Sequence, residues 1–521
     1  IGSQKGAATD EDGFFIIQNV APGSYNLEVY YLGYQTVKKG NVIVNPNRTT
    51  SLEIAMDESY IEGETVEVTA SYFEKPKESV VSTRSMNFEE IRRSPGDVAD
   101  IQRAMQALPA VVSGSDQMNE IIIRGGIPGE NLFLLDGIEI PNPNHFGVQG
   151  AGGGPINLLN SHMVRNVDFY AGAFSAKYGD KASSVMDISL RNGDRDRFRA
   201  EGSLGMAGVG LLLEGPVGIA NGSYIFSARK SYLDLIISST GLTAVPRYYN
   251  FQGKMTLQLN KNNTLLINGV YGSDNIDIED EDEAGYGRGA ENVRNANSLS
   301  VAGMTLRTFW RKNIFSHTTL SAVRNYYDID VYELPENSTF YTNISDELEL
   351  NLKTDFVYRI HANLDLNFGA SVKQIEFDHD IWARGDTLFL YDPASARPDS
   401  AVGIFRTYNT YEVNRKVNSY KTAFYAQTSL DFLKYFSLTG GLRYGKFEYT
   451  GYEAIDPRMG LSVRVHPKVT LNVAYGKHHQ TPSYIQISAN PANKHLKDKH
   501  TRQYVIGFDY LIREDINLVM E

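Results

Sequence analysis

The 521-residue chain contains no cysteine and only two tryptophans. Because cysteine is absent, disulfide frameworks, cysteine nucleophiles and cysteine-ligated metals are excluded, although the redox compartment is not identified. No apolar run approaches the roughly 18 residues that a membrane-spanning helix needs. A membrane protein built from this sequence would therefore be a closed β-barrel, since only helices and closed barrels satisfy their backbone hydrogen bonds in lipid.

Basic charge is also scarce. With 50 basic against 62 acidic residues, the formal net charge is -12, which argues against a nucleic-acid partner because phosphates require a basic surface. Tyrosine (32), phenylalanine (24) and glycine (46) are abundant instead, as is typical of a β-rich chain with many turns. At about 100 to 200 residues per domain, the length predicts several domains.

A short apolar strand begins the stretch that organises the chain. Ile121–Ile123 ends at Arg124, and Gly125 and Gly126 then allow the positive φ angles of a tight turn. The spacing therefore predicts a strand that feeds a turn.

Two further strands follow within the same stretch. Leu132–Leu135 leads into Asp136 and Gly137, a pair that folds a strand back as a hairpin. Val185–Leu190 is the closing strand, and the pair Tyr178-Gly179 precedes it.

The IRG, DG and YG motifs, in this order and spacing, resemble the plug domain of TonB-dependent outer-membrane receptors. The resemblance implies a mainly β protein with an α+β plug over 86–193 and a transmembrane antiparallel barrel over 194–521. It also implies a location in the outer membrane, with outer-membrane lipid around the barrel, the plug and N-terminal domain toward the periplasm and the long loops extracellular. The implied function is active import energised by TonB and its inner-membrane complex.

Residues 1–57 form a small β unit whose first strand is expected to be missing. Its DGFF, PGSYNLEV and LGY segments resemble the carboxypeptidase regulatory-like domain, a transthyretin-like β-sandwich found ahead of the plug in many receptors of the Bacteroidetes type. That domain carries no peptidase chemistry.

Residues 58–85 are rich in charge, serine and threonine and read as a linker. Within it, ETVEVTA resembles the TonB box, which offers an extended backbone to the sheet edge of TonB. An ordinary edge strand of a neighbouring domain is the alternative. The residues are Glu64, Thr65, Val66, Glu67, Val68, Thr69 and Ala70.

The plug is expected to begin with a helix capped by Asp97, because apolar residues recur at helical spacing from Val98 to Leu108. After the DG hairpin comes a loop rich in proline, asparagine and glycine, which is predicted to rise through the barrel toward substrate. Its candidate substrate-facing residues are Asn142, Asn144, His145, Phe146 and Gln149. The alternative is a loop that only seals the bore.

From Phe198 onward, long strands alternate apolar and polar residues, as Leu364–Val372 does. Short turns alternate with long connections, which is typical of outer-membrane barrels. The long connections are expected at 232–247, 275–296, 332–345, 379–416 and 480–500. About fourteen strands and a fifteenth from Asp515 are predicted, whereas plugged transporter barrels have 22, so the native protein is expected to extend beyond both ends.

Two clusters invite a metal-site interpretation. The acidic run Asp277–Glu283 lacks the spaced ligands and turn glycine of a calcium loop. The adjacent His478 and His479, with His495 and His500, would point to opposite faces of a strand. We therefore predict no metal site and no cofactor, and no arrangement of side chains indicates catalysis or an enzyme.

Import of a large, scarce nutrient such as a metal chelate, peptide or oligosaccharide is the function we predict. A SusC-like importer of glycans or peptides that works with a surface lipoprotein is an alternative, although AGAFSAKYGDKASS departs from the SusC pattern. A plugged barrel that serves at the surface or in secretion without import is another. Finally, Arg124 is expected to hold the plug to inward carboxylates of the barrel such as Asp365 and Asp431.

Overall fold

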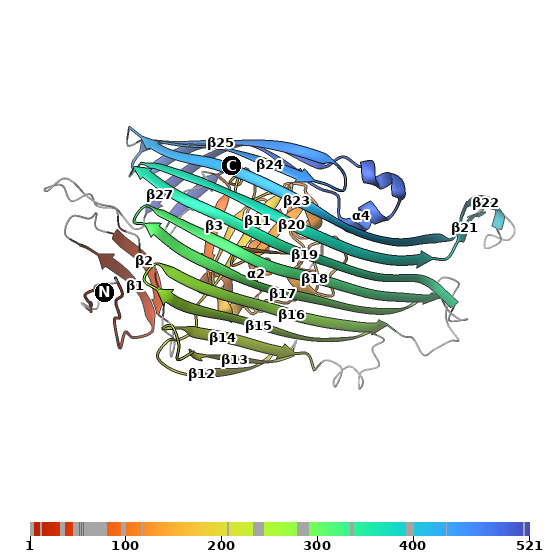
Figure 1. Ribbon diagram of the computed structural model, residues 1–521, viewed down its shortest axis with the longest axis horizontal. Helices are drawn as coiled ribbons and strands as arrows, with labels where there is room; N and C mark the ends of the chain where they lie inside the picture. The colour runs from red at the N-terminus through yellow and green to blue at the C-terminus, as the bar shows by residue number, and fades with distance from the viewer. Residues whose placement is uncertain are drawn as a thin grey trace.

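The computed structural model describes residues 5–10, 13–31, 37–44, 50, 52, 54, 56, 81–94, 100–115, 118–205, 208–232, 244–278, 291–333, 338–361, 363–391, 401–433, 435–513 and 516–521. A fifteen-stranded sheet curves around a smaller five-stranded one (Figure 1). We call residues 81–193 the plug and the fifteen-stranded sheet the wall. Within the described ranges, no helix is long and apolar enough to cross a membrane.

Near the N-terminus, two antiparallel strands pair, β1 (Gly23–Val29) and β2 (Val37–Val44). Their register shifts between Tyr25 and Leu27, as it does at a β-bulge. Before them, the Phe14 backbone N–H donates to the Asp10 carboxylate at 2.8 Å, closing the turn at Gly13.

The plug is built on a five-stranded sheet in the order β3-β10-β11-β6-β7. Its one parallel pair joins β11 to β6, and the other neighbours are antiparallel. The strands are β3 (Thr83–Asn87), β6 (Asn131–Leu135), β7 (Ile138–Ile140), β10 (Val164–Tyr170) and β11 (Ser184–Leu190). The predicted strands at 132–135 and 185–190 are confirmed, and β3 begins within the segment 58–85 that is expected to be linker and ends beyond it.

Short elements complete the plug. Two strand pairs join β4 (Val111–Val112) to β5 (Ile122–Ile123) and β8 (Asn144–His145) to β9 (Ile156–Asn157). The remaining elements are α1 (Phe88–Arg92), α2 (Ile101–Gln106), η1 (Pro128–Glu130) and η2 (Ser161–Met163).

The helix expected from Asp97 begins later. Asp97 lies outside the described residues, and the N-cap of α2 is Asp100, whose carboxylate accepts from the backbone N–H groups of Gln102 and Arg103. Such a cap satisfies amide donors that have no partner within the helix.

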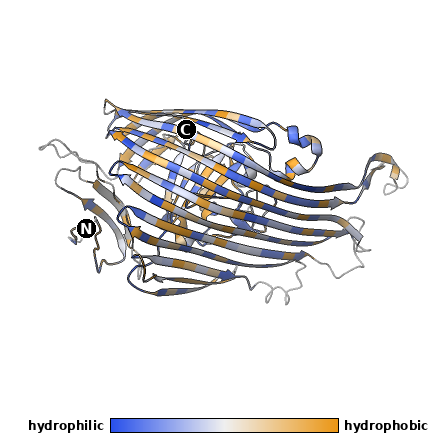
Figure 2. Cartoon of the chain, viewed as in Figure 1, coloured by the Kyte–Doolittle hydropathy of each residue, from blue (hydrophilic) through white to orange (hydrophobic). Residues whose placement is uncertain are grey.

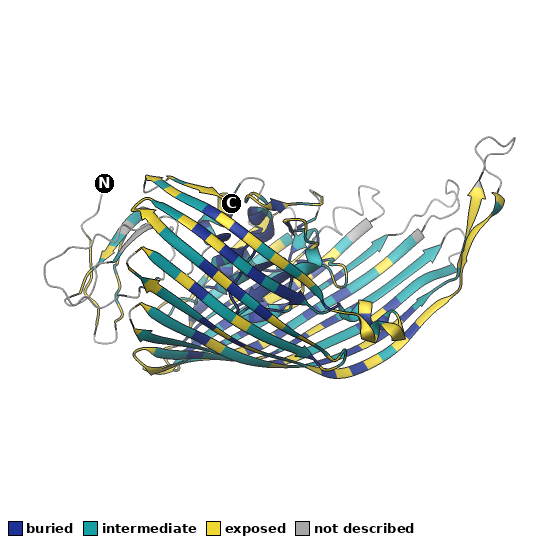
Figure 3. Cartoon of the chain, turned by 90° about the horizontal axis from the view of Figure 1, so that it is seen from above, coloured by how far each residue is buried: buried dark blue, intermediate teal, exposed yellow. Residues whose placement is uncertain are grey.

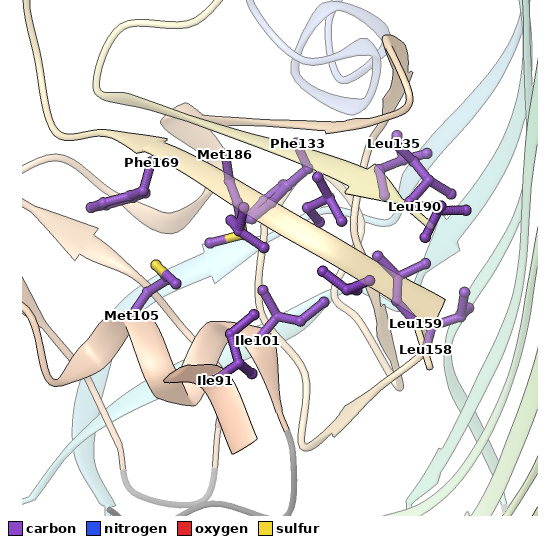
Figure 4. Close-up of a cluster of buried hydrophobic side chains, with 14 of the residues drawn as sticks. Ile91, Ile101, Met105, Phe133, Leu135, Leu158, Leu159, Phe169, Met186 and Leu190 are labelled. Atoms are coloured by element: carbon purple, nitrogen blue, oxygen red, sulfur yellow. The ribbon is translucent and has the colours of Figure 1, made fainter. Parts of the chain in front are cut away.

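The apolar core of the plug lies between its helices and its sheet. Figure 4 shows Ile91, Ile101 and Met105 of the helices facing the side chains of Phe133 and Met186 on the sheet, all of them buried. The same cluster continues into wall residues, namely Leu212, Ile225, Val270, Leu299, Val301 and Val323. Plug and wall therefore share one hydrophobic core.

The wall runs in sequence order from β12 to β28, and every neighbouring pair is antiparallel. Fifteen strands confirm the predicted number. They are β12 (Arg199–Gly205), β13 (Gly208–Pro216), β14 (Ser223–Lys230), β15 (Ala244–Asn260), β16 (Asn263–Ile278), β17 (Glu291–Arg311), β18 (Ile314–Glu333), β19 (Ser338–His361), β20 (Leu364–Ala383), β23 (Tyr411–Phe432), β24 (Phe436–Phe447), β25 (Tyr452–His466), β26 (Val469–Gln480), β27 (Lys499–Arg513) and β28 (Ile516–Met520).

Described strands extend into three of the connections expected to be long. β16 continues to Ile278, β19 begins at Ser338, and β20 reaches Ala383, because pairing extends well past the apolar part of each strand. Between β20 and β23, β21 (Asp386–Tyr391) and β22 (Ala401–Tyr408) form a separate hairpin that projects from the wall (Figure 1). In the last long connection lie α4 (Tyr484–Ser488) and η3 (Pro491–His495).

Strand β20 shows which face of the wall meets lipid. Asn367 is turned inward and 7% exposed, whereas Phe368 is turned outward and 38% exposed. From Ile375 the polarity of the two faces is exchanged: the inward side chains of Ile375 and Phe377 are apolar and fully buried, and the outward Asp378 is polar and exposed. The alternation is visible along the strands in Figures 2 and 3. An apolar outer face that gives way to a polar one is expected where a strand leaves hydrocarbon for water.

Candidate functional site

The boundary between plug and wall is the candidate site, and the three motifs each meet the wall there. At the first, Arg124 itself has φ 48° and Gly125 has φ 83°. Gly126 is required for a different reason than the predicted positive φ: a Cβ there would lie 2.5 Å from the Ser183 hydroxyl.

The Arg124 guanidinium links the plug to the wall. Its Nη2 lies 2.7 Å from Glu521 Oε2 and 2.8 Å from Ser82 Oγ. The predicted partner Asp365 is wrong, because Asp365 accepts instead from Arg359 at 3.1 Å. No contact between Arg124 and Asp431 is found among the described residues either. The carboxylate that binds Arg124 lies nearly 400 residues further along the chain.

The DG turn is also tied to the wall. Asp136 (φ 48°) and Gly137 (φ 84°) both have the left-handed backbone of a type I′ turn. The Asp136 carboxylate accepts from the Leu190 N–H at 3.0 Å and lies 2.9 Å from Lys254 Nζ on β15. Just beyond the turn, Glu139 lies 2.8 Å from Lys373 Nζ on β20. Burial by itself raises the pKa of Glu139, but Lys373 outweighs it, so that the pKa is lowered.

The YG segment is clamped by arginines of the wall. A Cβ on Gly179 would lie 2.0 Å from Arg443 Nε, so only glycine leaves room for this guanidinium. Arg443 donates to the Lys177 carbonyl at 3.1 Å, and Arg458 donates to the Tyr178 carbonyl at 2.8 Å. Glycine is therefore needed at position 179 because the side chain of a wall residue, Arg443, packs against it.

Asp180 follows the YG pair and forms an ion pair with Lys421 at 2.6 Å. Its carboxylate also accepts from the backbone N–H of Thr481 at 2.8 Å. Burial opposes ionisation, yet Lys421 and these hydrogen bonds lower the pKa of Asp180 to about 2. The carboxylate is therefore charged at neutral pH.

At the apex of the plug, three of the candidate substrate-facing residues are buried. Asn142 donates to the Gly153 carbonyl at 2.9 Å, and its side-chain oxygen accepts from the Asn144 N–H at 3.1 Å. His145 is fully buried, 3.1 Å from Asp274, and burial lowers its pKa despite that carboxylate. The hydrogen bonds of these side chains therefore hold the loop in shape.

The other two candidates lie nearer the surface. Phe146 (φ 56°) packs edge-on against Tyr248, with ring centroids 6.4 Å apart. Gln149 donates to Glu347 at 2.7 Å and accepts from Asn343 at 3.0 Å. Between them, Val148 has an exposed side chain that sequence reasoning did not select.

The two clusters considered as metal sites have other partners. His478 packs against Phe174 with ring centroids 4.1 Å apart, while His479 hydrogen-bonds to Asp456. Asp277 lies between Arg247 and Arg294, at 3.6 and 3.8 Å, and the rest of the acidic run lies outside the described residues. Across the described part of the chain, no group of three histidine, aspartate or glutamate side chains is placed to hold a metal ion.

The segment ETVEVTA at 64–70 lies outside the described residues. Sequence reasoning also missed residues 481–498, which it treated only as a long loop. This segment folds back against both wall and plug, and the apolar spacing of Tyr484 and Ile487 was its one local signal.

Three family models match the chain: the carboxypeptidase regulatory-like domain over residues 1–57, the TonB-dependent receptor plug domain over 75–185, and the TonB dependent receptor-like β-barrel over 227–518. Similar solved structures include a mutant of the ferric enterobactin receptor PfeA from Pseudomonas aeruginosa (16% identity, TM-score 0.58, 82% of this chain and 69% of that one). The siderophore receptor PirA from Acinetobacter baumannii is similar too, with 16% identity, a TM-score of 0.57, and coverage of 82% of this chain and 68% of that one. The outer membrane transporter YddB from Escherichia coli is also similar, with 13% identity, a TM-score of 0.58, and coverage of 83% of this chain and 67% of that one. At these identities the likeness concerns the fold.

Proposed function

Because the chain belongs to the TonB-dependent receptor family, whose barrel model covers residues 227–518, we propose that it imports a large, scarce nutrient. Family membership makes it an outer-membrane transport protein that interacts with TonB, and not an enzyme. Our proposal adds the kind of cargo, a metal chelate, peptide or oligosaccharide, and the assignment of residues 64–70 as the TonB box. It also places the plug and N-terminal domain on the periplasmic side and the projecting strand ends outside the cell.

One observation carries the proposal: polar contacts that can break and re-form hold the plug to the wall at the boundary. Ion pairs join it to strands on several sides, through Asp136, Glu139, Asp180 and Arg191. A passive pore would need no such closure. A plug held by ion pairs can be released by force and can close again when the same pairs re-form.

Force on the linker would reach the plug at a defined point. Val81, after the linker segment 64–70, is buried, and the next residue, Ser82, donates its backbone N–H to the Glu521 carboxylate at 2.6 Å. Its hydroxyl accepts from Arg124 at 2.8 Å. Tension on residues 64–70 would therefore act first on the contacts among Ser82, Arg124 and Glu521, which join the plug to the wall.

The test is Val66→Pro, which removes a backbone donor that strand addition to TonB requires. We expect uptake to fail while substrate still binds at the cell surface. Val66→Thr keeps the donor and is the matched control. A deletion strain grown on ferric chelates, peptides or oligosaccharides as limiting nutrients identifies the cargo, and normal uptake by the proline variant would contradict the box.

A second candidate is import together with a surface lipoprotein, and the hairpin β21–β22 favours it. This isolated hairpin exposes large apolar side chains, namely Leu388, Phe389, Leu390, Val402, Ile404, Phe405 and Tyr408. A lone two-stranded hairpin is marginal in water, and an exposed apolar patch often marks an interaction site. We expect a lipid-modified partner to co-purify with the parent and to be lost from a Val402→Asp/Phe405→Asp variant. An unchanged particle mass in the variant would exclude this candidate.

A further inference from the structure

Residues 481–498, which we call the strap, connect β26 to β27 but pack against a distant part of the wall. Helix α4 of the strap contacts β20, four strands away in the sheet order (Figure 1). The strap therefore crosses the inner side of the wall.

Apolar side chains fix the first half of the strap. Ile487 is fully buried against Ile375, Phe377 and Phe447 of the wall. The ring of Tyr484 stacks on Phe377, with centroids 5.1 Å apart and planes 14° from parallel. Most of the second half, residues 490–497, is exposed.

One chain of polar contacts leads from the strap to the DG hairpin of the plug. The Tyr484 hydroxyl donates to the Glu349 carboxylate. Lys373 Nζ lies 2.8 Å from Glu349 and 2.8 Å from Glu139 of the plug. The wall carboxylate of Glu349 is thus shared between the strap and the cation that binds the plug.

A second chain leads to the apex of the plug. The Ser488 hydroxyl lies 2.8 Å from His379 Nδ1, and His379 Nε2 lies 3.3 Å from Glu347. Glu347 in turn accepts from Gln149 at 2.7 Å. His379 is fully buried, so this route is shielded from solvent.

The strap also touches the plug directly. Thr481 donates both its N–H and its hydroxyl to Asp180, each at 2.8 Å. At the apex, Gly150 has φ 76°, and a Cβ there would lie 3.3 Å from the Ser483 hydroxyl. The strap therefore reaches the plug beside the YG motif, at its apex and, through Lys373, beside the DG turn.

We propose that the strap is a lid. While the strap is docked on the wall it holds the plug closed, and an arriving substrate displaces the strap and so releases the plug. This rests on the proposed import function and adds its regulation. A large substrate entering from outside would meet the exposed second half of the strap first and would displace α4 through it. Glu349 would then lose the Tyr484 hydroxyl, and His379 would lose the Ser488 hydroxyl. Both side chains could rotate, which loosens the hold of Glu349 on Lys373 and of His379 on Glu347, the partner of Gln149. Removing the strap's polar links should raise the frequency of plug opening about five- to tenfold, in the range of typical couplings between sites.

The test uses the native protein, extracted from membranes and placed in planar bilayers with KCl as the only probe. In Tyr484→Phe/Ser488→Ala the stacked ring and the Ile487 anchor remain, and only the two polar links are lost. We expect more frequent openings and opening at a lower urea concentration than in the parent. Tyr435→Phe/Ser437→Ala, at the opposite end of the wall, is the matched control and should behave as the parent does.

A disulfide gives an independent test, because the chain has no other cysteine. Oxidised His379→Cys/Ser488→Cys fixes the strap to β20 and should open less often than the same protein after reduction. Equal opening in the oxidised and reduced forms, or parental behaviour of the double variant, would overturn the proposal. Conductance requires neither TonB nor a nutrient, so failure of the import proposal would leave this result standing.

Discussion

Lys373 on β20 lies between a plug carboxylate and a wall carboxylate, 2.8 Å from Glu139 and 2.8 Å from Glu349. Lys373→Met removes the cation but keeps the length of the side chain. The lysine is 12% exposed, whereas the side chains of Glu139 and Glu349 are 29% and 23% exposed. Breaking a buried ion pair by removing one partner costs about 3–5 kcal/mol. Because both carboxylates keep some contact with solvent, we take the lower end, about 3 kcal/mol, which corresponds to a roughly hundredfold larger open fraction.

The assay is single-channel conductance in KCl, supported by sensitivity of cells to a large antibiotic. Glu139→Gln should have a smaller effect of about 1 kcal/mol, since Lys373 still has Glu349 as a partner. The double variant Lys373→Met/Glu139→Gln should open less than Lys373→Met alone, because the unpaired plug carboxylate has gone. If the two single effects simply add, the pair does not link plug to wall, and the reasoning is refuted.

Three further predictions concern single positions. Arg124→Ala should loosen the resting plug by about 1–2 kcal/mol, because its pair with Glu521 is partly solvated; conductance no different from the parent would leave Arg124 as a turn residue only. Gly179→Ala should displace Arg443 and lower the free energy of unfolding by about 1–3 kcal/mol, as measured by calorimetry, and Arg443→Ala in the same chain should relieve the clash. Burial raises the pKa of Asp498 to about 6, and neighbouring Asp180 adds to the shift while Lys421 opposes it. An acid whose pKa is raised on folding favours the folded state below its ordinary pKa and loses that contribution as the pH rises through about 6. Asp498 is the last residue of the strap and is buried there, so its protonation should favour docking of the strap in the same way. Plug opening should then be more frequent at pH 7 than at pH 4.5, and an Asp498→Asn variant that kept this dependence would contradict the assignment.

The sequence determined those features that short-range patterns encode. The alternation of apolar and polar residues along Leu364–Val372 predicted a wall strand with an apolar outer face, and the structure has one there. Asp136-Gly137 predicted a hairpin, because few residue pairs adopt two consecutive positive φ angles at low cost. A strand of period two and a tight turn each depend on only a few neighbouring residues, so both can be read locally.

The tertiary structure decided which residues meet across the boundary between plug and wall. Arg124 pairs with Glu521, nearly 400 positions away, because the fold brings Glu521 beside the IRG turn, and no local pattern selects Glu521 over Asp365. Asn142 and His145 were predicted to face substrate because their loop, rich in proline, asparagine and glycine, was expected to rise through the barrel. In the fold Asn142 hydrogen-bonds within the loop and His145 pairs with Asp274 of the wall, since the polar groups of a buried loop need hydrogen-bond partners. The strap is the extreme case: its position is the sum of contacts with β20, β23 and the plug, and each of those partners is distant in sequence.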